Sequence, residues 1–280
     1  MLSQYHLMAQ ISQLYIYPVK SLGGIGLQQA QVTSRGLEHD RRWMLIDEHN
    51  RFLSQRSHPQ LALFALAVTP VGIEVTHKPT QASIIIPYQP QASEKITVSI
   101  WDDNCSATVV SEEINQWFSH ILQINCRLVY MGNDDLRPVD PKYAGAEHIT
   151  SFSDAYPMLL IGQSSLDDLN SRLNQAVPMD RFRPNMVIDG TAPYEEDLMT
   201  HFTTSDIDFY GVKPCARCVM TTIDQDTALG GAEPLKILSG YRQANKKIYF
   251  GQNLIHHGEG IIKVGDVIEI KKLGPELKFD

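Results

Sequence analysis

The sequence is poor in cysteine, in positive charge and in long apolar runs. Four cysteines in 280 residues are too few for a disulfide scaffold. Residues 1–10 carry no secretory signal, so we expect reduced thiols and a cytoplasmic protein. Lysine and arginine number 24 against 32 acidic residues, a net charge of −8, so nucleic acid is not an expected partner. No apolar run approaches the ~18 residues of a membrane span, so no membrane association is expected.

The sequence also lacks a dinucleotide-binding fingerprint. Its glycine pairs, Gly23-Gly24 and Gly230-Gly231, do not have the Gly-x-Gly-x-x-Gly spacing that opens a dinucleotide-binding helix. A nicotinamide or flavin site is therefore not expected. The length suits two modest domains or one large β domain.

Strand patterns dominate what is present. Short runs of β-branched and aromatic residues end at turn residues, which is typical of strands. Such runs are residues 11–17, 43–47, 83–87, 95–101, 158–161, 185–188, 207–210 and 219–223, with two more strands around a Gly-Asp turn in 260–270. Many short strands with few helices predict a mainly β protein with some helices (α+β), built on β-barrels.

Three segments are predicted as helices. Ser111 is a good N-cap, and apolar residues recur at helical spacing from 114 to 122, which places Trp117 and Phe118 in the core. Residues 164–173 and 234–241 are also predicted as helices, because each segment has a residue that suits the start of a helix followed by apolar residues at helical spacing. Residues 132–150 are polar and contain prolines and glycines, so they indicate a linker or long loop between domains.

The segment 213–224, Lys-Pro-Cys-Ala-Arg-Cys-Val-Met-Thr-Thr-Ile-Asp, contains Cys215 and Cys218. A thiolate is a soft metal ligand, and the adjacent cation of Arg217 favours the thiolate form. A thioredoxin-like redox pair needs a following helix, whereas a strand is predicted here. A structural zinc site needs four ligands. Two interpretations stay open: a metal site with one thiolate ligand, and two buried cysteines that act as small apolar residues.

Cations cluster at the ends of the predicted strands. These clusters are Lys20-Ser21, Arg41-Arg42 and the segment 181–185, Arg-Phe-Arg-Pro-Asn. Each arginine taken singly is explained by pairing with a neighbour such as Asp40 or Asp180. Three clusters in an acidic chain instead indicate a site for an anionic cofactor, since arginine forks suit phosphate groups.

Four motifs in order give the chain a family resemblance. They are Tyr17-Pro18-Val19-Lys20-Ser21, Asp40-Arg41-Arg42-Trp43, Arg181-Phe182-Arg183-Pro184-Asn185 and Lys213-Pro214-Cys215-Ala216-Arg217-Cys218. Together they resemble the MOSC-domain molybdenum enzymes, the group with the mitochondrial amidoxime-reducing component and its bacterial relatives. The resemblance implies a MOSC N-terminal β-barrel domain over residues 8–131 and a MOSC domain over residues 132–274.

The resemblance also implies a cofactor and its site. The cofactor is molybdenum cofactor (a molybdopterin), with Cys218 as the metal ligand and a catalytic residue. Asp154 matches an acidic, catalytic residue near the metal. The residues that match the family's cofactor-binding positions are Lys20, Ser21, Arg41, Arg183, Asn185, Arg217 and Cys218.

The activity that the resemblance implies is the reduction of N-hydroxylated compounds to amines by oxygen abstraction at molybdenum. The four cysteines do not provide the iron–sulfur domain of some bacterial relatives, so electrons would come from a flavin reductase, an iron–sulfur protein or both. Two alternatives remain. One is a molybdenum-cofactor binding or sulfur-transfer module, without the pyridoxal-dependent domain of the cofactor sulfurases. The other is a non-catalytic protein with a zinc or buried-thiol Cys-x-x-Cys.

Overall fold

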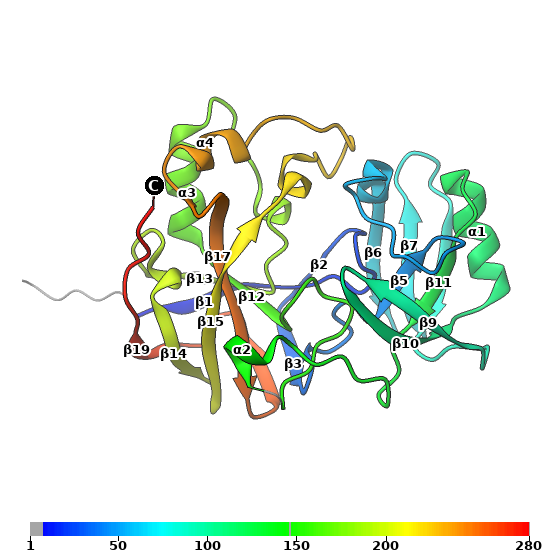
Figure 1. Cartoon of the computed structure of the whole chain (residues 1–280), viewed down its shortest axis with the longest axis horizontal. Helices are drawn as coiled ribbons and strands as arrows, with labels where there is room; N and C mark the ends of the chain where they lie inside the picture. The colour runs from blue at the N-terminus through cyan, green and yellow to red at the C-terminus, as the bar shows by residue number, and fades with distance from the viewer. Residues whose placement is uncertain (1–7, 146, 280) are drawn as a thin grey trace, which may run out of the picture.

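A computed structural model describes residues 8–145 and 147–279, which fold into two lobes (Figure 1). Residues 1–7, most of the segment in which we found no secretory signal, lie outside the described residues. Within the part that is described, no helix has the length and apolar character needed to cross a membrane. The protein is mainly β with a few short helices, as the sequence predicted.

The larger lobe is built on a nine-stranded sheet in the order β19-β14-β15-β17-β12-β13-β1-β2, with β16 paired to β17. Its longest ladder joins β15 and β17 in antiparallel register, from Asp208 opposite His257 to Arg217 opposite Ile248. The strands are β1 Gln10–Ile16, β2 Ile25–Leu27, β12 Met158–Gly162, β13 Met186–Asp189, β14 Met199–Thr204, β15 Ile207–Arg217, β16 Gln243–Ala244, β17 Lys247–His257 and β19 Glu269–Leu273.

The first strands of the chain pack with its second half. β1 pairs antiparallel with β13, and β3 (Gln29–Thr33) pairs with β18 (Gly260–Lys263) and with β4 (Gly36–Leu37). Ile11, Leu14 and Val32 are buried in one core with side chains of β12 to β17. Strands β1 to β4 therefore belong in space to the larger lobe, although they precede the division at residue 131 that the sequence motifs suggest. Val19 and Leu22, in the turn between β1 and β2, pack instead in the core of the smaller lobe.

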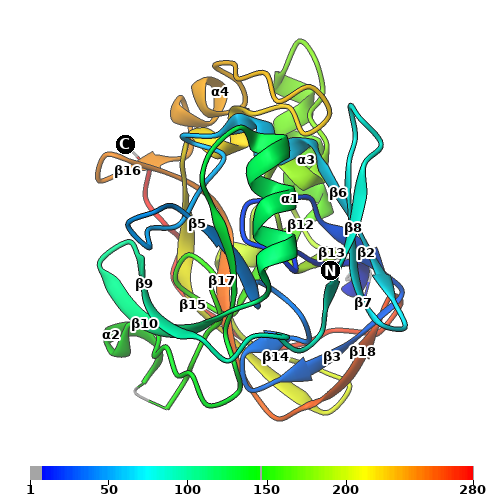
Figure 2. The same cartoon turned by 90° about the vertical axis from the view of Figure 1, so that its right-hand side faces the viewer.

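The smaller lobe contains two sheets and one helix. Its core is mainly aliphatic and includes the aromatic rings of Trp43, Phe64 and Phe118. Helix α1 (Glu112–Leu122) covers one side (Figure 2). Ser111 Oγ accepts from the backbone N of Ile114 and caps α1, as predicted. The four-stranded sheet is β5 Trp43–Ile46, β11 Arg127–Tyr130, β10 Asp103–Val109 and β9 Lys95–Ile100; the three-stranded sheet is β6 Phe64–Thr69, β7 Gly72–His77 and β8 Ser83–Pro87.

The remaining helices are short. They are α2 Pro141–Ala144, α3 Gln163–Arg172 and α4 Leu235–Ser239, with 3-10 turns at η1 Pro59–Leu63, η2 Met179–Arg181, η3 Glu195–Asp197 and η4 Val219–Thr222. The helices predicted at 164–173 and 234–241 are thus present as α3 and the shorter α4. The predicted linker 132–150 contains α2 and is anchored by the buried residues Asp135 and Arg137.

Two strand predictions need correction. Residues 219–223 are not a strand, because Thr222 Oγ1 donates to the carbonyl of Val219 at 2.8 Å and Thr221 N donates to the carbonyl of Cys218 at 3.1 Å. These local bonds stabilise the 3-10 turn η4 in place of a ladder. The two strands of 260–270 exist as β18 and β19, but they pair with β3 and β14 and not with each other.

Candidate functional site

A cavity of about 260 Å³ lies between the two lobes, and both lobes line it. Among the described residues that line it, Asp154 is the one carboxylate. The cationic residues in its lining are Lys20, Arg41, Arg56, Arg181, Arg183, Lys213 and Arg217. Asp40 and Asp224, outside the lining, neutralise Arg41 and Arg181. The excess of positive charge in a chain of net charge −8 marks this cavity as a site for an anion.

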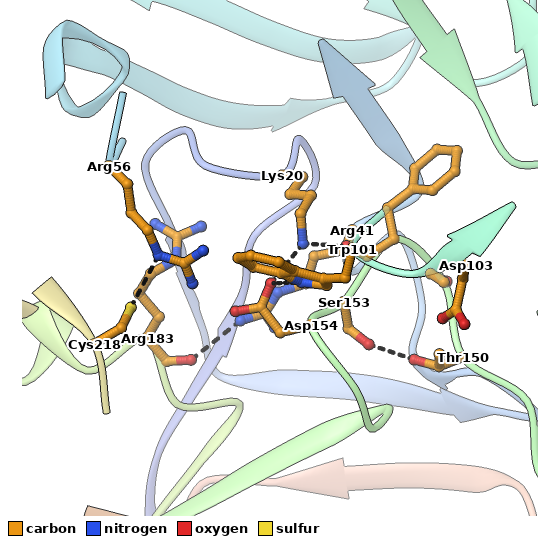
Figure 3. Close-up of polar contacts among 12 residues, drawn as sticks. Lys20, Arg41, Arg56, Trp101, Asp103, Thr150, Ser153, Asp154, Arg183 and Cys218 are labelled. Atoms are coloured by element: carbon orange, nitrogen blue, oxygen red, sulfur yellow. Dashed lines mark hydrogen bonds and ion pairs between the residues drawn. The ribbon is translucent and has the colours of Figure 1, made fainter. Parts of the chain in front are cut away.

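Lys20 and Ser21 follow β1 in a tight turn at one wall of the cavity. Both are buried. Lys20 Nζ donates to Asp154 Oδ1 at 2.7 Å and to the carbonyl of Phe152 at 2.8 Å (Figure 3). Burial lowers the pKa of Lys20, while Asp154 acts in the opposite direction. The lysine is thereby held in one position with its ammonium group at the cavity.

Arg41 and Arg183 both lie against one aromatic ring. The guanidinium carbons of Arg41 and Arg183 lie 4.4 Å and 4.2 Å from the ring centroid of Tyr17. Arg41 also donates to Asp40 Oδ2 at 2.6 Å and to Asn185 Oδ1 at 3.0 Å. Burial and the charge of Arg41 lower the pKa of Arg183 to about 10. Two half-buried guanidinium groups that repel each other form a cradle that an anion would stabilise.

The backbone at this wall is in an unusual conformation. Ser21, Arg41 and Arg183 have φ values of +70°, +49° and +56°, and Trp101, across the cavity, has +54°. Side chains crowd the backbone in this left-handed region, so non-glycine residues held there concentrate at functional sites. Four such residues line this one cavity, which supports its role independently of the charges.

Cys218 follows the last residue of β15 and begins the turn η4. Its thiol faces a cation that the sequence analysis did not identify: Arg56 Nε donates to Cys218 Sγ at 3.3 Å (Figure 3). Arg217, the expected neighbour cation, donates instead to the carbonyl of Phe182 at 2.8 Å. Its Nε is buried and has no hydrogen-bond partner among the described residues.

Cys215 differs from Cys218 in its surroundings. It packs against the apolar cluster around Phe182 and Phe250, and burial raises the pKa of its thiol. All four cysteines are free thiols in the part of the chain that is described. A packing role for Cys215 and a ligand role for Cys218 fit these environments.

Asp154 links the lobes. Its Oδ1 accepts from Lys20 Nζ and, at 3.3 Å, from Trp101 Nε1 of the smaller lobe. Burial opposes ionisation, yet the charge of Lys20 holds the pKa of Asp154 well below its usual range. At neutral pH the group is a carboxylate, so any part in the reaction would be electrostatic and not proton donation. Its catalytic role stays a prediction.

The structure brings the sequence-predicted residues together with few exceptions. Lys20, Ser21, Arg41, Asp154, Arg183, Asn185, Arg217 and Cys218 all line the cavity. Arg42 does not, because its Nε donates to the carbonyl of Met131 in the smaller lobe. Sequence reasoning missed Arg56 and Trp101. No motif marks either residue. The one signal in the sequence was the large aromatic side chain of Trp101 in the turn Trp-Asp-Asp, where small or polar residues are usual.

The sequence matches two known domain families. Residues 8–125 match the MOSC N-terminal beta barrel domain, and residues 147–269 match the MOSC domain. Mitochondrial amidoxime-reducing component 1 of Mus musculus is 32% identical over 282 residues, covering 92% of this chain and 81% of that protein. The chain belongs to the MOSC-domain family.

Two further relatives have names that differ from each other. Mitochondrial amidoxime-reducing component 1 of Homo sapiens is 31% identical, covering 92% of this chain and 82% of that protein. Molybdenum cofactor sulfurase of Oryza sativa subsp. japonica is 30% identical, covering 86% of this chain but 32% of that protein. The names of these relatives connect the MOSC proteins with amidoxime reduction and with molybdenum cofactor.

The MOSC cavity combines two kinds of binding group. One is a set of charge-assisted donors on Lys20, Arg41 and Arg183, which suits an anion with several oxygen acceptors. The other is the thiol of Cys218, which as a thiolate suits a soft metal. A ligand that carries both an anionic organic part and a soft metal fits this donor set.

Proposed function

We propose that this MOSC protein is a molybdenum-cofactor-dependent oxidoreductase that reduces N-hydroxylated compounds to amines. The observation that carries the proposal is the meeting, in one cavity, of the Cys218 thiol with a surplus of cations, one of them buried and the others half-buried. The substrate class comes from similarity to the amidoxime-reducing components.

Cofactor binding would divide between two groups of residues. The cationic wall of Lys20, Ser21, Arg41, Arg183, Asn185 and Arg217 would hold the pterin and its phosphate. The unpartnered Nε of Arg217 supports this role, because a buried donor without an acceptor costs stability until a ligand supplies one. Cys218 would hold the metal.

Bound molybdenum cofactor would supply the redox chemistry. Overall, an N–OH group, two electrons and two protons give an amine N–H and water. The protein would orient the substrate beside Cys218 and keep Asp154 ionised. Electrons would come from a separate flavin reductase, an iron–sulfur protein or both, because Cys105 and Cys126 are buried in the smaller lobe, away from Cys218. We also propose that the sequence divides into a MOSC N-terminal domain over residues 8–131 and a MOSC domain over residues 132–274.

The second candidate is a cofactor-binding or sulfur-transfer module without its own reductase activity. Similarity to the rice sulfurase favours it, although this chain spans less than a third of that protein. One experiment separates the two functions. Cofactor-loaded protein is supplied with dithionite-reduced viologen and an amidoxime, and amine formation is measured. Amine formation supports the reductase. Full cofactor occupancy without turnover on N-hydroxy, N-oxide or S-oxide substrates supports the sulfur-transfer module.

A further inference from the structure

Trp101 stands where a turn would normally have glycine. Ile100 and Asp103 pair directly across β9 and β10, so Trp101 and Asp102 form a two-residue hairpin loop. The φ of Trp101 is +54°, and a positive φ at the first loop residue favours glycine because a side chain crowds the backbone. An indole held in this conformation needs an explanation outside the turn itself.

The indole reaches the cavity from the smaller lobe. The Arg56 guanidinium carbon lies 4.1 Å from its ring centroid, and Phe52 meets it edge-on with centroids 4.9 Å apart. Its Nε1 donates to Asp154 (Figure 3). Trp101 is nevertheless 44% exposed. These contacts fix the orientation of the ring and leave part of its surface open beside the cavity.

The other two tryptophans have ordinary roles. Trp43 is fully buried in the core of the smaller lobe, and Trp117 packs against the same core from helix α1. Trp101 joins no core of the described residues other than through its edge contact with Phe52. Its position is thus not explained by packing.

Arg56 connects the indole with the thiol. The same guanidinium lies over Trp101 and donates to Cys218 Sγ at 3.3 Å. Arg56 thus covers part of the indole on the side of Cys218, and a flat ligand would use the part of the ring that Arg56 leaves open. Arg56 acts here as a positioning residue, because it holds the ring at a fixed place relative to Cys218.

We propose that Trp101 determines substrate specificity: its indole is the wall against which a planar, conjugated N-hydroxylated substrate, such as an aryl amidoxime, stacks beside Arg56, with its N–OH group inside the cavity that Trp101 and Cys218 both line. The inference rests on the proposed reductase function. Aromatic rings attract each other in offset or edge-to-face arrangements, whereas hydroxylamine itself has no π surface to stack. The wall therefore favours conjugated over small substrates.

The test compares two substrates and two readouts. Wild type, Trp101→Phe and Trp101→Gly are loaded with cofactor and supplied with reduced viologen, with Trp117→Phe as the matched control. The ratio of kcat/KM for benzamidoxime to that for hydroxylamine should fall about 10-fold in Trp101→Gly, mostly through KM. It should stay near the wild-type value in Trp101→Phe and in the Trp117→Phe control.

Binding is measured separately in the oxidised, cofactor-loaded protein without reductant. Calorimetry should show benzamidoxime affinity about 10-fold weaker in Trp101→Gly, and kept in Trp101→Phe. Intrinsic fluorescence should be quenched by benzamidoxime in wild type but not in Trp101→Phe. An unchanged substrate ratio and unchanged affinity in Trp101→Gly would overturn the inference while leaving the reductase function standing. If wild type reduces neither substrate, the proposed function fails, and the calorimetry alone decides whether Trp101 is a stacking wall.

Discussion

Some charged side chains at this cavity lower the stability of the protein when no cofactor is bound. Lys20, Arg41 and Arg183 are held close together in a site where burial lowers the pKa of Lys20 and of Arg183. Buried like charges cost stability unless a counter-ion is bound. Lys20 and Arg41 have carboxylate partners in Asp154 and Asp40, whereas Arg183 has no ion-pair partner among the described residues. The cofactor-free protein and the cofactor-bound protein should therefore respond in opposite ways when the charge of Arg183 is removed.

Arg183→Met is the sharpest test of this opposition. The thermal stability of cofactor-free protein should rise, by roughly 2–4 °C for each kcal/mol of repulsion relieved. The pterin recovered per folded chain should fall by roughly 10-fold, because a charge-assisted hydrogen bond is lost. Scanning calorimetry and pterin analysis measure the two effects. Lys272→Met, an exposed lysine of β19, is the control and should change neither. Lower stability together with full pterin occupancy in Arg183→Met would contradict the cradle.

The two cysteines should differ in their effect on turnover. Cys218→Ala should abolish molybdenum-dependent turnover, because no other thiol lies in the same environment. Cys215→Ala should retain most of it, since that side chain packs against the cluster around Phe250. Viologen-driven turnover at matched folding is the measurement. Equal loss in both variants would instead indicate a paired-cysteine site.

Residues with a local signature were the ones that the sequence could identify. Lys20, Arg183 and Cys218 stand in ordered motifs at strand ends, where ligands are usually met. Arg56 and Trp101 have no such signature. Their contacts with Cys218 and Asp154 cross between lobes. Local sequence patterns do not encode a contact between residues that are so far apart in the sequence.

Among the secondary-structure elements, the β9–β10 hairpin holds the indole of Trp101 in a strained turn, and this strain lowers the stability of the protein. Trp101→Gly and Trp101→Ala both remove the ring, but glycine alone accepts a φ of +54° without strain. Trp101→Gly should therefore be more stable than Trp101→Ala by about 1 kcal/mol. Urea denaturation of the two variants gives the difference directly. Equal stability would mean that the turn relaxes and that the strained backbone has no part in presenting the indole.

The turn η3 is attached to helix α3 through a buried acid. Glu196 Oε2 accepts from Ser165 Oγ at 2.7 Å, and burial, followed by the charge of Asp197, raises the pKa of Glu196 to about 7. The folded protein thus binds a proton that the unfolded chain releases near its ordinary pKa of 4.5. The stability that this proton contributes is fully present below about pH 4.5 and is lost as pH rises through about 7, by at most roughly 3 kcal/mol.

Glu196→Gln should remove this pH dependence. The measurement is the unfolding free energy between about pH 4 and 8, with Glu259→Gln, an exposed glutamate, as the control that keeps it. A slope in Glu196→Gln equal to that of wild type would show that Glu196 is ionised in the folded state.

The long β15–β17 pair shows why the strand predicted from the sequence is shorter than β15. Sequence patterns predicted 207–210, yet β15 runs on to Arg217. Gly211 and Pro214 interrupt the β-former run, and the ladder accommodates them with register shifts between Gly211 and Lys213 and between Pro214 and Ala216. Pairing with β17 supplies the hydrogen bonds that local propensity does not favour, and it places Cys215 and Cys218 at the cavity.

At the scale of the whole molecule, the cavity exists because the chain crosses between lobes. Lys20 comes from the turn after β1, Arg56 and Trp101 from the smaller lobe, and Arg183 and Cys218 from the second half. The mainly β architecture followed from strand patterns and motifs. The packing of β1 and β3 with β13 and β18 did not, because strand order in a sheet is set by tertiary contacts.

Electron supply is also a property of the whole molecule. The sequence has no dinucleotide-binding fingerprint. Cofactor-loaded protein with NADH alone should therefore give no amine, and adding a flavin reductase, with or without an iron–sulfur carrier, should restore turnover. Amine release is measured by chromatography, with viologen-driven turnover as the positive control. NADH-driven turnover by the purified chain alone would contradict the need for a partner.

The most direct test of the central claim is molybdenum X-ray absorption of the purified, cofactor-loaded protein and its Cys218→Ser variant. The cofactor dithiolene gives two sulfur ligands, and the account predicts a third from Cys218 in wild type that is missing in the variant. The same number of sulfur ligands in both proteins, or zinc in place of molybdenum in the native protein, would contradict it.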